Sequence, residues 1–333
     1  MYPGPADPDL GVFVAGTVRE LERTGHVVDR AVIASRGGSR LKHLGLVARA
    51  AALALRRRPD VVYAHFLVPA GAAGVLAAVL ARVPLVVTAH GADVRNIGRV
   101  PGVRLLTRLT AARATRVVAV SRFLARELAE RVPATAGRIE VIDSGVDLER
   151  FRPADAATAR GRLGWEGEGP AFLFVGQLDE RKNVLRLVEA FERLSAGRLA
   201  LVGDGPLRPR LDGRPGVRLV GRVAHDEVAV WMAACDVLCL PSLVEPFGQV
   251  LLEAMACERS VLATRSGGPP EFVPPEAGVL VDPFSVDAIE AGLRRAAELP
   301  RPNPAARHAA AEHDVRRQVA RVTTLLEAAV AGR

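Results

Sequence analysis

Two glutamates in the second half of this 333-residue chain are placed to bind hydroxyl groups. Glu245 lies in a loop after an apolar run, and Glu253 interrupts a second apolar run, 250–255. A carboxylate among apolar neighbours is unusual unless it has a partner. Carboxylates accept hydrogen bonds from paired hydroxyls, so we expect one to hold a ribose diol and the other a sugar hydroxyl. The alternative for each is a solvated glutamate on a helix.

Glycine-rich turns and cations near these glutamates are suited to a diphosphate. The loop 176–183 opens a helix and supplies backbone N–H groups together with Arg181 and Lys182. A helix N-terminus with adjacent cations binds phosphate groups. Gly267 and Gly268, which precede Pro269, are candidates for a second cradle of N–H groups. The alternative is that each turn only connects a strand to a helix tightly.

A histidine in the first half is also a candidate. His90 ends an apolar run and is followed by Gly91. It either donates a hydrogen bond to a substrate oxygen or caps the strand end. His65 also ends a predicted strand, but without acidic or glycine neighbours we interpret it as structural.

The elements that must position these residues alternate along the chain. Strands are predicted at 27–34, 61–65, 85–90, 116–120, 138–142, 171–175, 198–202, 217–220, 237–240, 260–263 and 278–281. In the first half, helical spacing of apolar residues separates them at 11–24, 41–57, 70–81, 103–112 and 121–131. This alternation predicts an α/β fold with two doubly wound, Rossmann-like domains. Glycine and charge gather after the strands, where such sheets bind ligands, so we expect the domains to face a cleft holding an anionic ligand.

Three segments follow from the composition of the chain. We expect an N-terminal domain at 1–155, a second domain at 165–310 and a C-terminal helix in 311–333 that packs back toward the first domain. The glycine- and proline-rich edges of 151–170 mark the junction. No run of about 18 uncharged apolar residues occurs, and the start lacks the features of a secretory signal, so a cytoplasmic protein is predicted.

The excess of positive over negative residues lies in the first half of the chain. The net charge is +8, with +9 in residues 1–150 and −1 in the remainder. Basic residues flank the predicted helix over 44–55 at Arg36, Arg40, Lys42, His43, Arg49 and 56–58, and a second series runs from Arg95 to Arg116. A basic half indicates an anionic partner such as a membrane surface, a lipid phosphate or nucleic acid. Nucleic acid ranks lower because neither a binding motif nor an aromatic platform accompanies the charge. Solvated helix faces are the alternative.

Taken in order, the motifs resemble the retaining glycosyltransferases of the GT-B fold in the large family-four group. The second-half motifs are Val175-Gly176, Gly203-Asp204-Gly205-Pro206, Glu245-Pro246-Phe247-Gly248, Glu253-Ala254-Met255-Ala256 and Ser266-Gly267-Gly268. The first half adds Thr88-Ala89-His90-Gly91, Asp93 and Ser144-Gly145-Val146-Asp147. Together they span nearly the whole chain.

The resemblance implies a role for each matching position. Glu245 and His90 would be catalytic, facing the donor sugar and contacting the transferred sugar. Lys182 would bind the donor diphosphate and Glu253 the nucleotide ribose. The remaining donor-binding positions are Gly11, Gly176, Arg181, Val223, Phe247 and Gly248. The resemblance also implies that no metal or cofactor is needed, because cations and helix ends neutralise the leaving diphosphate.

Two departures from the family pattern carry expectations of their own. Gln177 stands where relatives have an arginine, which predicts weaker diphosphate binding unless Arg181 substitutes. The chain begins at Met1-Tyr2-Pro3 without the buried strand that precedes this point in relatives. We therefore expect an N-terminal domain without its first strand, through a mis-assigned start or a truncation, and reduced stability of that domain.

The predicted function is transfer of a sugar from a UDP-, GDP- or ADP-sugar to a sugar or lipid-linked acceptor, in cell-envelope polysaccharide or glycolipid synthesis. Peripheral contact with an anionic membrane through the basic half would place it at the inner face. Two alternatives remain open: a nucleotide-sugar epimerase of the same fold, and a catalytically defective glycosyltransferase-like protein.

Overall fold

The computed structural model describes residues 1–39, 41–194 and 196–332. Arg40 of the predicted basic stretch and Arg333 of the predicted C-terminal segment lie outside the described residues. The chain divides into two compact units: Met1–Ser144 with the segment from Val315 onward, and Gly145–Asp314. Residues 145–155, which the sequence assigns to the N-terminal domain, therefore belong to the second unit.

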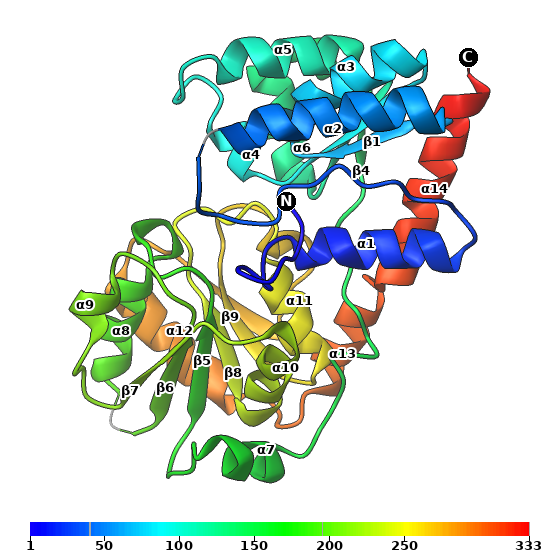
Figure 1. The fold of residues 1–333 in the computed structure, drawn as a ribbon. Helices are drawn as coiled ribbons and strands as arrows, with labels where there is room; N and C mark the ends of the chain where they lie inside the picture. Colours follow the sequence, from blue (N-terminus) through cyan, green and yellow to red (C-terminus); the bar gives the residue numbers. More distant parts are fainter. Residues whose placement is uncertain (40, 195, 333) are drawn as a thin grey trace. The chain divides into compact units, whose positions relative to one another are not determined.

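The first unit is a four-stranded parallel sheet in the order β1-β2-β3-β4, with helices on its faces (Figure 1). Its strands are β1 Val62–His65, β2 Leu85–Ala89, β3 Arg116–Ala119 and β4 Ile139–Val141. Its helices are α1 Val12–Arg23, α2 Leu41–Arg57, α3 Ala72–Ala81, α4 Ala92–Arg95, α5 Val103–Arg113, α6 Arg122–Arg131 and α14 Val315–Ala331.

Alternating side chains of these strands serve the two faces of the sheet. Val86 of β2 and Val118 of β3 pack against Val322 of α14. On the opposite face, the side chain of Leu85 lies next to Gly74 of α3, where an added Cβ would come within 3.0 Å of it. The period of two along each strand thus buries both faces, as parallel sheets require.

The strand predicted at 27–34 is wrong. Residues 26–35 form no strand, and the side chain of Val27 is 95% exposed. The physical reason is that the open edge of β1 faces a cavity, so this segment has no strand directly beside it with which to pair. A cavity of about 840 Å³ adjoins this edge, lined by β1, residues 27–32 and apolar side chains of α1, α2 and α3. No strand precedes β1 in the described part of the chain.

The second unit holds a six-stranded parallel sheet in the order β10-β9-β8-β5-β6-β7 (Figure 1). Its strands are β5 Ala171–Val175, β6 Arg198–Val202, β7 Val217–Gly221, β8 Val237–Leu240, β9 Ser260–Thr264 and β10 Gly278–Val281. Its helices are α7 Ala156–Leu163, α8 Val184–Glu192, α9 Arg208–Leu211, α10 His225–Ala234, α11 Gln249–Ala256, α12 Val286–Glu298 and α13 Pro304–Ala311.

The strand order of this sheet reverses between β5 and β8. After β5 the chain builds outward through β6 and β7, and it then returns to place β8 on the other side of β5. Neighbouring loops run in opposite directions from such a point, which opens a crevice at the carboxyl ends of the two strands. The loops that follow β5 and β8 are therefore the expected location of a ligand site in this unit.

Candidate functional site

An ion pair joins the loops that follow β5 and β8. The ammonium Nζ of Lys182 lies 2.6 Å from Oε2 of Glu245, and the hydroxyl of Ser242 donates to the same oxygen at 2.8 Å. The Glu245 side chain is 8% exposed and that of Lys182 is 23% exposed. Two residues predicted for the site thus meet at the point where the strand order reverses, and their charges leave a nearly neutral pair.

Two of the backbone N–H groups predicted for a phosphate cradle in the loop after β5 are already bound within the loop. The carboxylate of Asp179 accepts hydrogen bonds from the backbone N–H groups of both Arg181 and Lys182, each at 3.1 Å. The Arg181 guanidinium is also bound to Asp179, at 2.5 Å, and to Gln177 at 3.3 Å. Because Asp179 already occupies these donors, the ammonium of Lys182 is the feature of this loop that reaches the crevice.

Glycines bring the loops after β5 and β6 together. A Cβ on Gly203 would lie 1.9 Å from the carbonyl oxygen of Gly176. The backbone at Gly203 has a φ of +134°, in the region that favours glycine. Gly176, predicted to contact the donor, therefore has at least a structural part in this close approach.

Of the two glycines predicted for a second phosphate cradle, Gly267 and Gly268, the second has its N–H group occupied. The N–H of Gly268 donates to the carbonyl oxygen of Glu245 at 2.8 Å, and a Cβ on Gly267 would lie 2.0 Å from that oxygen. The N–H of Glu245 in turn donates to the carbonyl of Ser266 at 3.0 Å. These glycines instead let the loop after β9 hold the backbone of Glu245 in place.

The N-terminus of α11 presents free backbone N–H groups at this crevice. Gly248 caps the helix with a φ of +98°, a conformation that glycine adopts without strain. Within the described residues, the backbone N–H groups of Phe247, Gly248, Gln249 and Val250 have no protein acceptor. Free N–H groups at the positive end of a helix bind phosphate or a sugar oxygen. The predicted contribution of Phe247 and Gly248 through their backbone is consistent with this geometry.

Glu253 lies one turn into α11 and is almost fully buried. Its side chain is 7% exposed, and its nearest charged neighbour is Nε2 of His225, 3.7 Å from Oε1. The guanidinium of Arg150 lies 2.5 Å from Nδ1 of the same ring. Because arginine can only donate, Nδ1 accepts, and the proton of a neutral His225 faces Glu253. The carboxylate therefore keeps lone pairs for a ligand.

The sequence does not predict His225 and Arg150 as residues of the site. A lone histidine after a strand carries no spacing signal, and its partner Arg150 lies 75 positions away in sequence. Val223 is two residues before His225, and within the described residues its backbone N–H and C=O have no protein partner.

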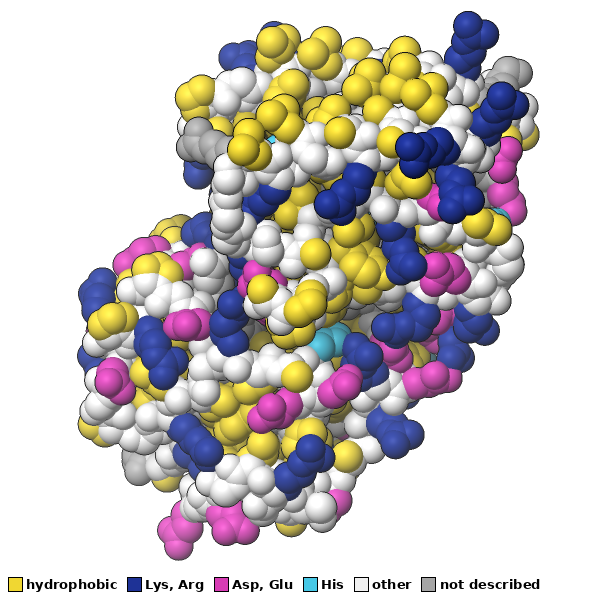
Figure 2. All heavy atoms as spheres, in the orientation of Figure 1, with side chains coloured by type: hydrophobic (Ala, Val, Ile, Leu, Met, Phe, Trp, Pro, Cys, Tyr) yellow, Lys and Arg dark blue, Asp and Glu magenta, His cyan; other side chains and the backbone are white. Residues whose placement is uncertain are grey.

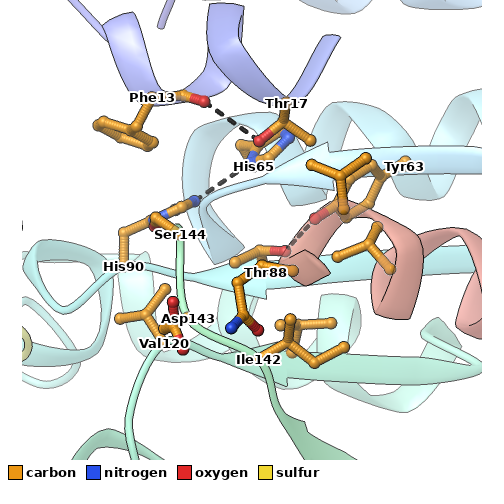
Figure 3. Close-up of a pocket in the computed structure, with 14 residues that line it drawn as sticks. Phe13, Thr17, Tyr63, His65, Thr88, His90, Val120, Ile142, Asp143 and Ser144 are labelled. Carbon is orange, nitrogen blue, oxygen red and sulfur yellow. Dashed lines mark hydrogen bonds between the residues drawn. The ribbon is translucent and has the colours of Figure 1, made fainter. Parts of the chain in front are cut away.

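In the first unit, His90 lies in a small cavity of about 20 Å³, which has room for about one water molecule. Figure 3 shows side chains from several elements converging there, among them Phe13, Tyr63, His65, Thr88 and Asp143. Phe13 and Phe66 flank the His90 ring at centroid distances of 4.8 and 4.6 Å. These contacts fix the plane of the imidazole.

His65 is not merely structural, because it binds the candidate histidine. Its Nδ1 lies 3.1 Å from Nε2 of His90, with the two rings nearly parallel at 24° (Figure 3). Burial lowers the pKa of His65 to about 3 and the pKa of His90 well below its ordinary value. Both rings are therefore neutral near pH 7, and one donates to the other. This hydrogen bond makes the tautomer of one ring depend on the tautomer of the other. It leaves Nδ1 of His90 available to another partner.

Asp93 holds the loop that carries His90. Its carboxylate accepts from the N–H groups of His90 and Gly91, at 3.1 and 2.9 Å, and from Leu67 at 2.8 Å. Burial raises the pKa of Asp93, while these hydrogen bonds act in the opposite direction. The carboxylate thus ties the loops after β1 and β2 together and positions His90.

Gly11 caps α1 with a φ of +66°, and a Cβ there would meet the carbonyl oxygen of Met1 at 2.7 Å. Within the described residues, the N–H groups of Val12 and Phe13 at the start of this helix have no protein acceptor. Gly11 therefore opens a helix N-terminus suited to an anion, as predicted for a residue near the donor phosphates.

Two family models match the chain. Residues 8–150 match Glycosyltransferase Family 4, and residues 169–298 match Glycosyl transferases group 1. The two matches fall in the first and second units and together cover most of the sequence.

Curated relatives carry related names. TuaC of Bacillus subtilis, named for teichuronic acid biosynthesis, is 30% identical over 242 residues, which cover 71% of this chain and 61% of TuaC. The D-inositol 3-phosphate glycosyltransferase of Xylanimonas cellulosilytica is 36% identical over 250 residues, covering 67% of this chain and 60% of that protein. The chain thus spans about three fifths of the length of these relatives.

Solved structures share the fold. Sucrose-phosphate synthase from Thermosynechococcus elongatus has a TM-score of 0.80 at 22% identity, covering 97% of this chain and 94% of that one. HepE from Anabaena in complex with UDP-glucose has a TM-score of 0.75 at 21% identity, covering 98% of both. The predicted α/β fold of the GT-B type is confirmed. With two family models in sequence order on this fold, the chain belongs to the family-four glycosyltransferases.

Proposed function

We propose that this chain is a retaining glycosyltransferase that moves a sugar from a nucleotide-sugar donor to an acceptor. The observation that carries the proposal is the arrangement at the strand reversal of the second unit. There the Lys182–Glu245 pair joins the loops after β5 and β8, and α11 presents free N–H groups and the buried Glu253. A cation, a helix N-terminus and a hydroxyl-binding carboxylate match the diphosphate and ribose of a nucleotide sugar.

We assign each of these residues a role in donor binding. Glu253 accepts hydrogen bonds from the ribose hydroxyls, and the backbone of Val223 meets the base. The N–H groups at Gly248 and the ammonium of Lys182 stabilise the negative charge that develops on the departing diphosphate. Glu245, held by Lys182 and Ser242, faces the donor sugar.

In the first unit, we assign to His90 a hydrogen bond to the transferred sugar. Its ring is neutral because burial lowers its pKa, so it serves as a hydrogen-bond partner rather than as a cation. Retention follows if the departing phosphate itself takes the proton of the incoming acceptor hydroxyl on the same face of the sugar. That step needs no protein nucleophile, and Glu245 then acts by charge and position.

We propose that the reaction proceeds without a metal ion. Within the described residues, no group of three or more His, Cys, Asp or Glu side chains is placed to hold one. Lys182 and the helix N-termini supply the positive charge that a metal would otherwise provide. Activity that persists in EDTA is the expected result.

The acceptor is proposed to be a sugar or lipid-linked intermediate of cell-envelope polysaccharide or glycolipid assembly at the cytoplasmic face of the membrane. Support comes from the name of TuaC, which refers to teichuronic acid biosynthesis, and from the basic first half of the chain. HepE has been solved with UDP and with UDP-glucose, which supports a uridine donor among the nucleotide sugars.

The proposal is tested with a thermal-shift panel of UDP, GDP, ADP and their sugar conjugates in EDTA. A ligand at about 100 times its Kd stabilises the folded state by about 2.7 kcal/mol. We expect one nucleotide family to raise the melting temperature, and the Glu253→Gln variant to lose that shift. Slow release of free sugar from the responding donor, with the α or β anomer identified by NMR, then tests retention. A folded protein that no nucleotide stabilises would contradict the proposal.

A further inference from the structure

The outer layer of the first unit exposes an unusual number of large apolar side chains. Helices α2, α3 and α5 pack side by side on one face of the sheet. Most of the large hydrophobic residues exposed on the described chain belong to this layer: Leu41, Leu44, Leu55, Leu76, Val79, Leu80, Val100, Leu105, Leu106 and Leu109. Figure 2 shows these yellow side chains gathered over α2, α3 and α5 at the top of the view. We call this set the leucine face.

The leucine face is bordered by arginines. On α5, Leu105 and Leu109 are 63% and 53% exposed, and they lie one turn apart beside a parallel row formed by Arg104 and Arg108. On α2, Arg49 and Arg56 likewise flank the exposed leucines. In the part of the chain that the structure describes, none of these four arginines has a hydrogen-bond or ion-pair partner.

Acidic residues are nearly absent from this region. From residue 41 to residue 126 the sequence has fourteen Lys and Arg residues, and its acidic residues are Asp60 and Asp93. The carboxylate of Asp93 is buried in the loop that holds His90. Arg57 of α2 is paired with Asp29, but Arg49, Arg56, Arg104 and Arg108 have no carboxylate partner among the described residues. The leucine face therefore combines exposed apolar side chains with four unpaired positive charges.

We propose that the leucine face docks on the surface of an anionic lipid bilayer. Arginines bind lipid phosphates through paired hydrogen bonds, and leucines beside them enter the boundary between headgroups and acyl chains. On an anionic bilayer the arginines would contact lipid phosphates and the leucines would contact acyl chains, so both kinds of side chain gain an interaction that water does not offer. No helix among the described residues is long and apolar enough to cross a membrane.

The observations disfavour two other occupants. A second copy docking through the same face would place arginines against arginines with no carboxylate in the interface, which costs like-charge repulsion. Nucleic acid would satisfy the arginines but not the leucines, and no aromatic residue is among the exposed apolar side chains of this face. A bilayer satisfies both.

The docking goes beyond sugar transfer and is independent of it. It uses the outer side of α2, α3 and α5, whereas the residues assigned to the donor lie in the second unit, at the start of α1 and at His90 after β2. Vesicle binding can therefore fail while nucleotide binding holds, and the reverse is equally possible.

The test is co-sedimentation of the full chain with vesicles of phosphatidylcholine alone and of phosphatidylcholine with 40 mol% phosphatidylglycerol. We expect binding to the mixed vesicles that weakens with added salt, and little binding to the neutral ones. Arg104→Gln with Arg108→Gln should weaken the partition roughly 25-fold, at about five-fold per arginine. Leu105→Glu with Leu109→Glu should weaken it at least as much.

Matched controls come from the second unit. Phe284 is 63% exposed, as is Leu105, so Phe284→Glu tests the same change elsewhere. Arg162→Gln is the control for the arginine variants. Far-ultraviolet circular dichroism melts show whether each variant is folded. Equal vesicle binding by the Leu105→Glu/Leu109→Glu variant and the parent protein would overturn the proposal. So would a dimer in sedimentation velocity that these changes dissociate, or tighter binding to an oligonucleotide than to the mixed vesicles.

Discussion

Replacing Glu253 by glutamine should change the affinity for the nucleotide and the stability of the folded protein in opposite directions. The side chain is 7% exposed, and its nearest charged neighbour is the His225 ring at 3.7 Å. Its oxygens have no hydrogen-bond donor within the described residues. The buried charge is therefore incompletely compensated in the free protein and is positioned for a donor that arrives with the ligand.

The size of the effect follows from the number of hydrogen bonds at stake. A ribose diol would give two hydrogen bonds to the carboxylate, each worth about 1.5–3 kcal/mol because one partner is charged. Glutamine keeps one acceptor oxygen but turns an N–H toward the second hydroxyl. A loss of about 3 kcal/mol is expected, which weakens the Kd for the nucleotide by roughly 150-fold.

Stability should move in the opposite direction. The neutral amide has almost the shape of the carboxylate and removes a desolvated charge, so the free energy of unfolding should rise by up to about 1 kcal/mol. For a unit of this size, that raises the melting temperature by about 2–4 °C. Isothermal titration with the responding nucleotide and a calorimetric melt measure the two effects on the same sample.

The control is Glu276→Gln, which makes the same change on an exposed glutamate of the second unit. It should alter neither quantity. If Glu253→Gln binds the nucleotide as tightly as the parent protein, the carboxylate does not hold the ribose. If the variant instead loses stability, the side chain is a structural partner of His225, and the reasoning from its burial is wrong.

Three further predictions follow from individual contacts. Lys182→Ala leaves the buried carboxylate of Glu245 with Ser242 as its one partner, so the free energy of unfolding should fall by about 2 kcal/mol. The Lys182→Ala/Glu245→Gln double variant should recover most of this loss. Urea melts measure both variants, and equal losses in the single and the double variant would refute the pairing. Burial lowers the pKa of His65 to about 3, so the folded state keeps its full stability above pH 6.5 and loses stability as the pH falls toward 3. The free energy of unfolding should fall by about 1.4 kcal/mol per pH unit in that range. A His65→Gln variant whose free energy of unfolding keeps the same slope between pH 6.5 and 5 would contradict this prediction. The cavity beside β1 should bind the dye anilinonaphthalene sulfonate in the native protein. An apolar five-residue strand fused ahead of Met1 should displace the dye, lower its fluorescence and raise the melting temperature. A serine-glycine fusion of equal length should change neither the fluorescence nor the melting temperature.

The sequence predicts the second unit well because its strands are short runs of buried apolar residues. The observed bounds of β5, β6, β8 and β10 coincide with the predicted ones. Each of these strands is paired with a neighbour, so local pattern and tertiary pairing agree. The segment 27–34 has an equally good pattern, yet it forms no strand, because strand formation needs a partner whose backbone is free beside it.

The candidate site is predictable in its residue types but not in its hydrogen bonds. Lys182 and Glu245 are 63 positions apart, and only the strand reversal brings their side chains within 2.6 Å. A sequence motif cannot show that Asp179 has already taken the N–H groups of its own loop. Nor does it show that Gly268 donates its N–H to Glu245. A glycine-rich loop signals close approach of backbones, but not whether the approaching group is a ligand or another loop.

The free N–H groups at α11 bear on the departure at Gln177. The resemblance implies an arginine at this position, and Arg181 or another arginine is the expected substitute. The structure engages Arg181 with Asp179 at 2.5 Å, so its charge is already partly neutralised. Lys182 is likewise paired with Glu245, yet a diphosphate brings two negative charges that compete for that ammonium. If α11 carries most of the phosphate binding, restoring the arginine through Gln177→Arg should tighten nucleoside diphosphate binding by no more than about ten-fold, the weight of one partly exposed cation. A gain of several hundred-fold would mean that the missing arginine, rather than the helix N-terminus, is the principal phosphate ligand of this fold.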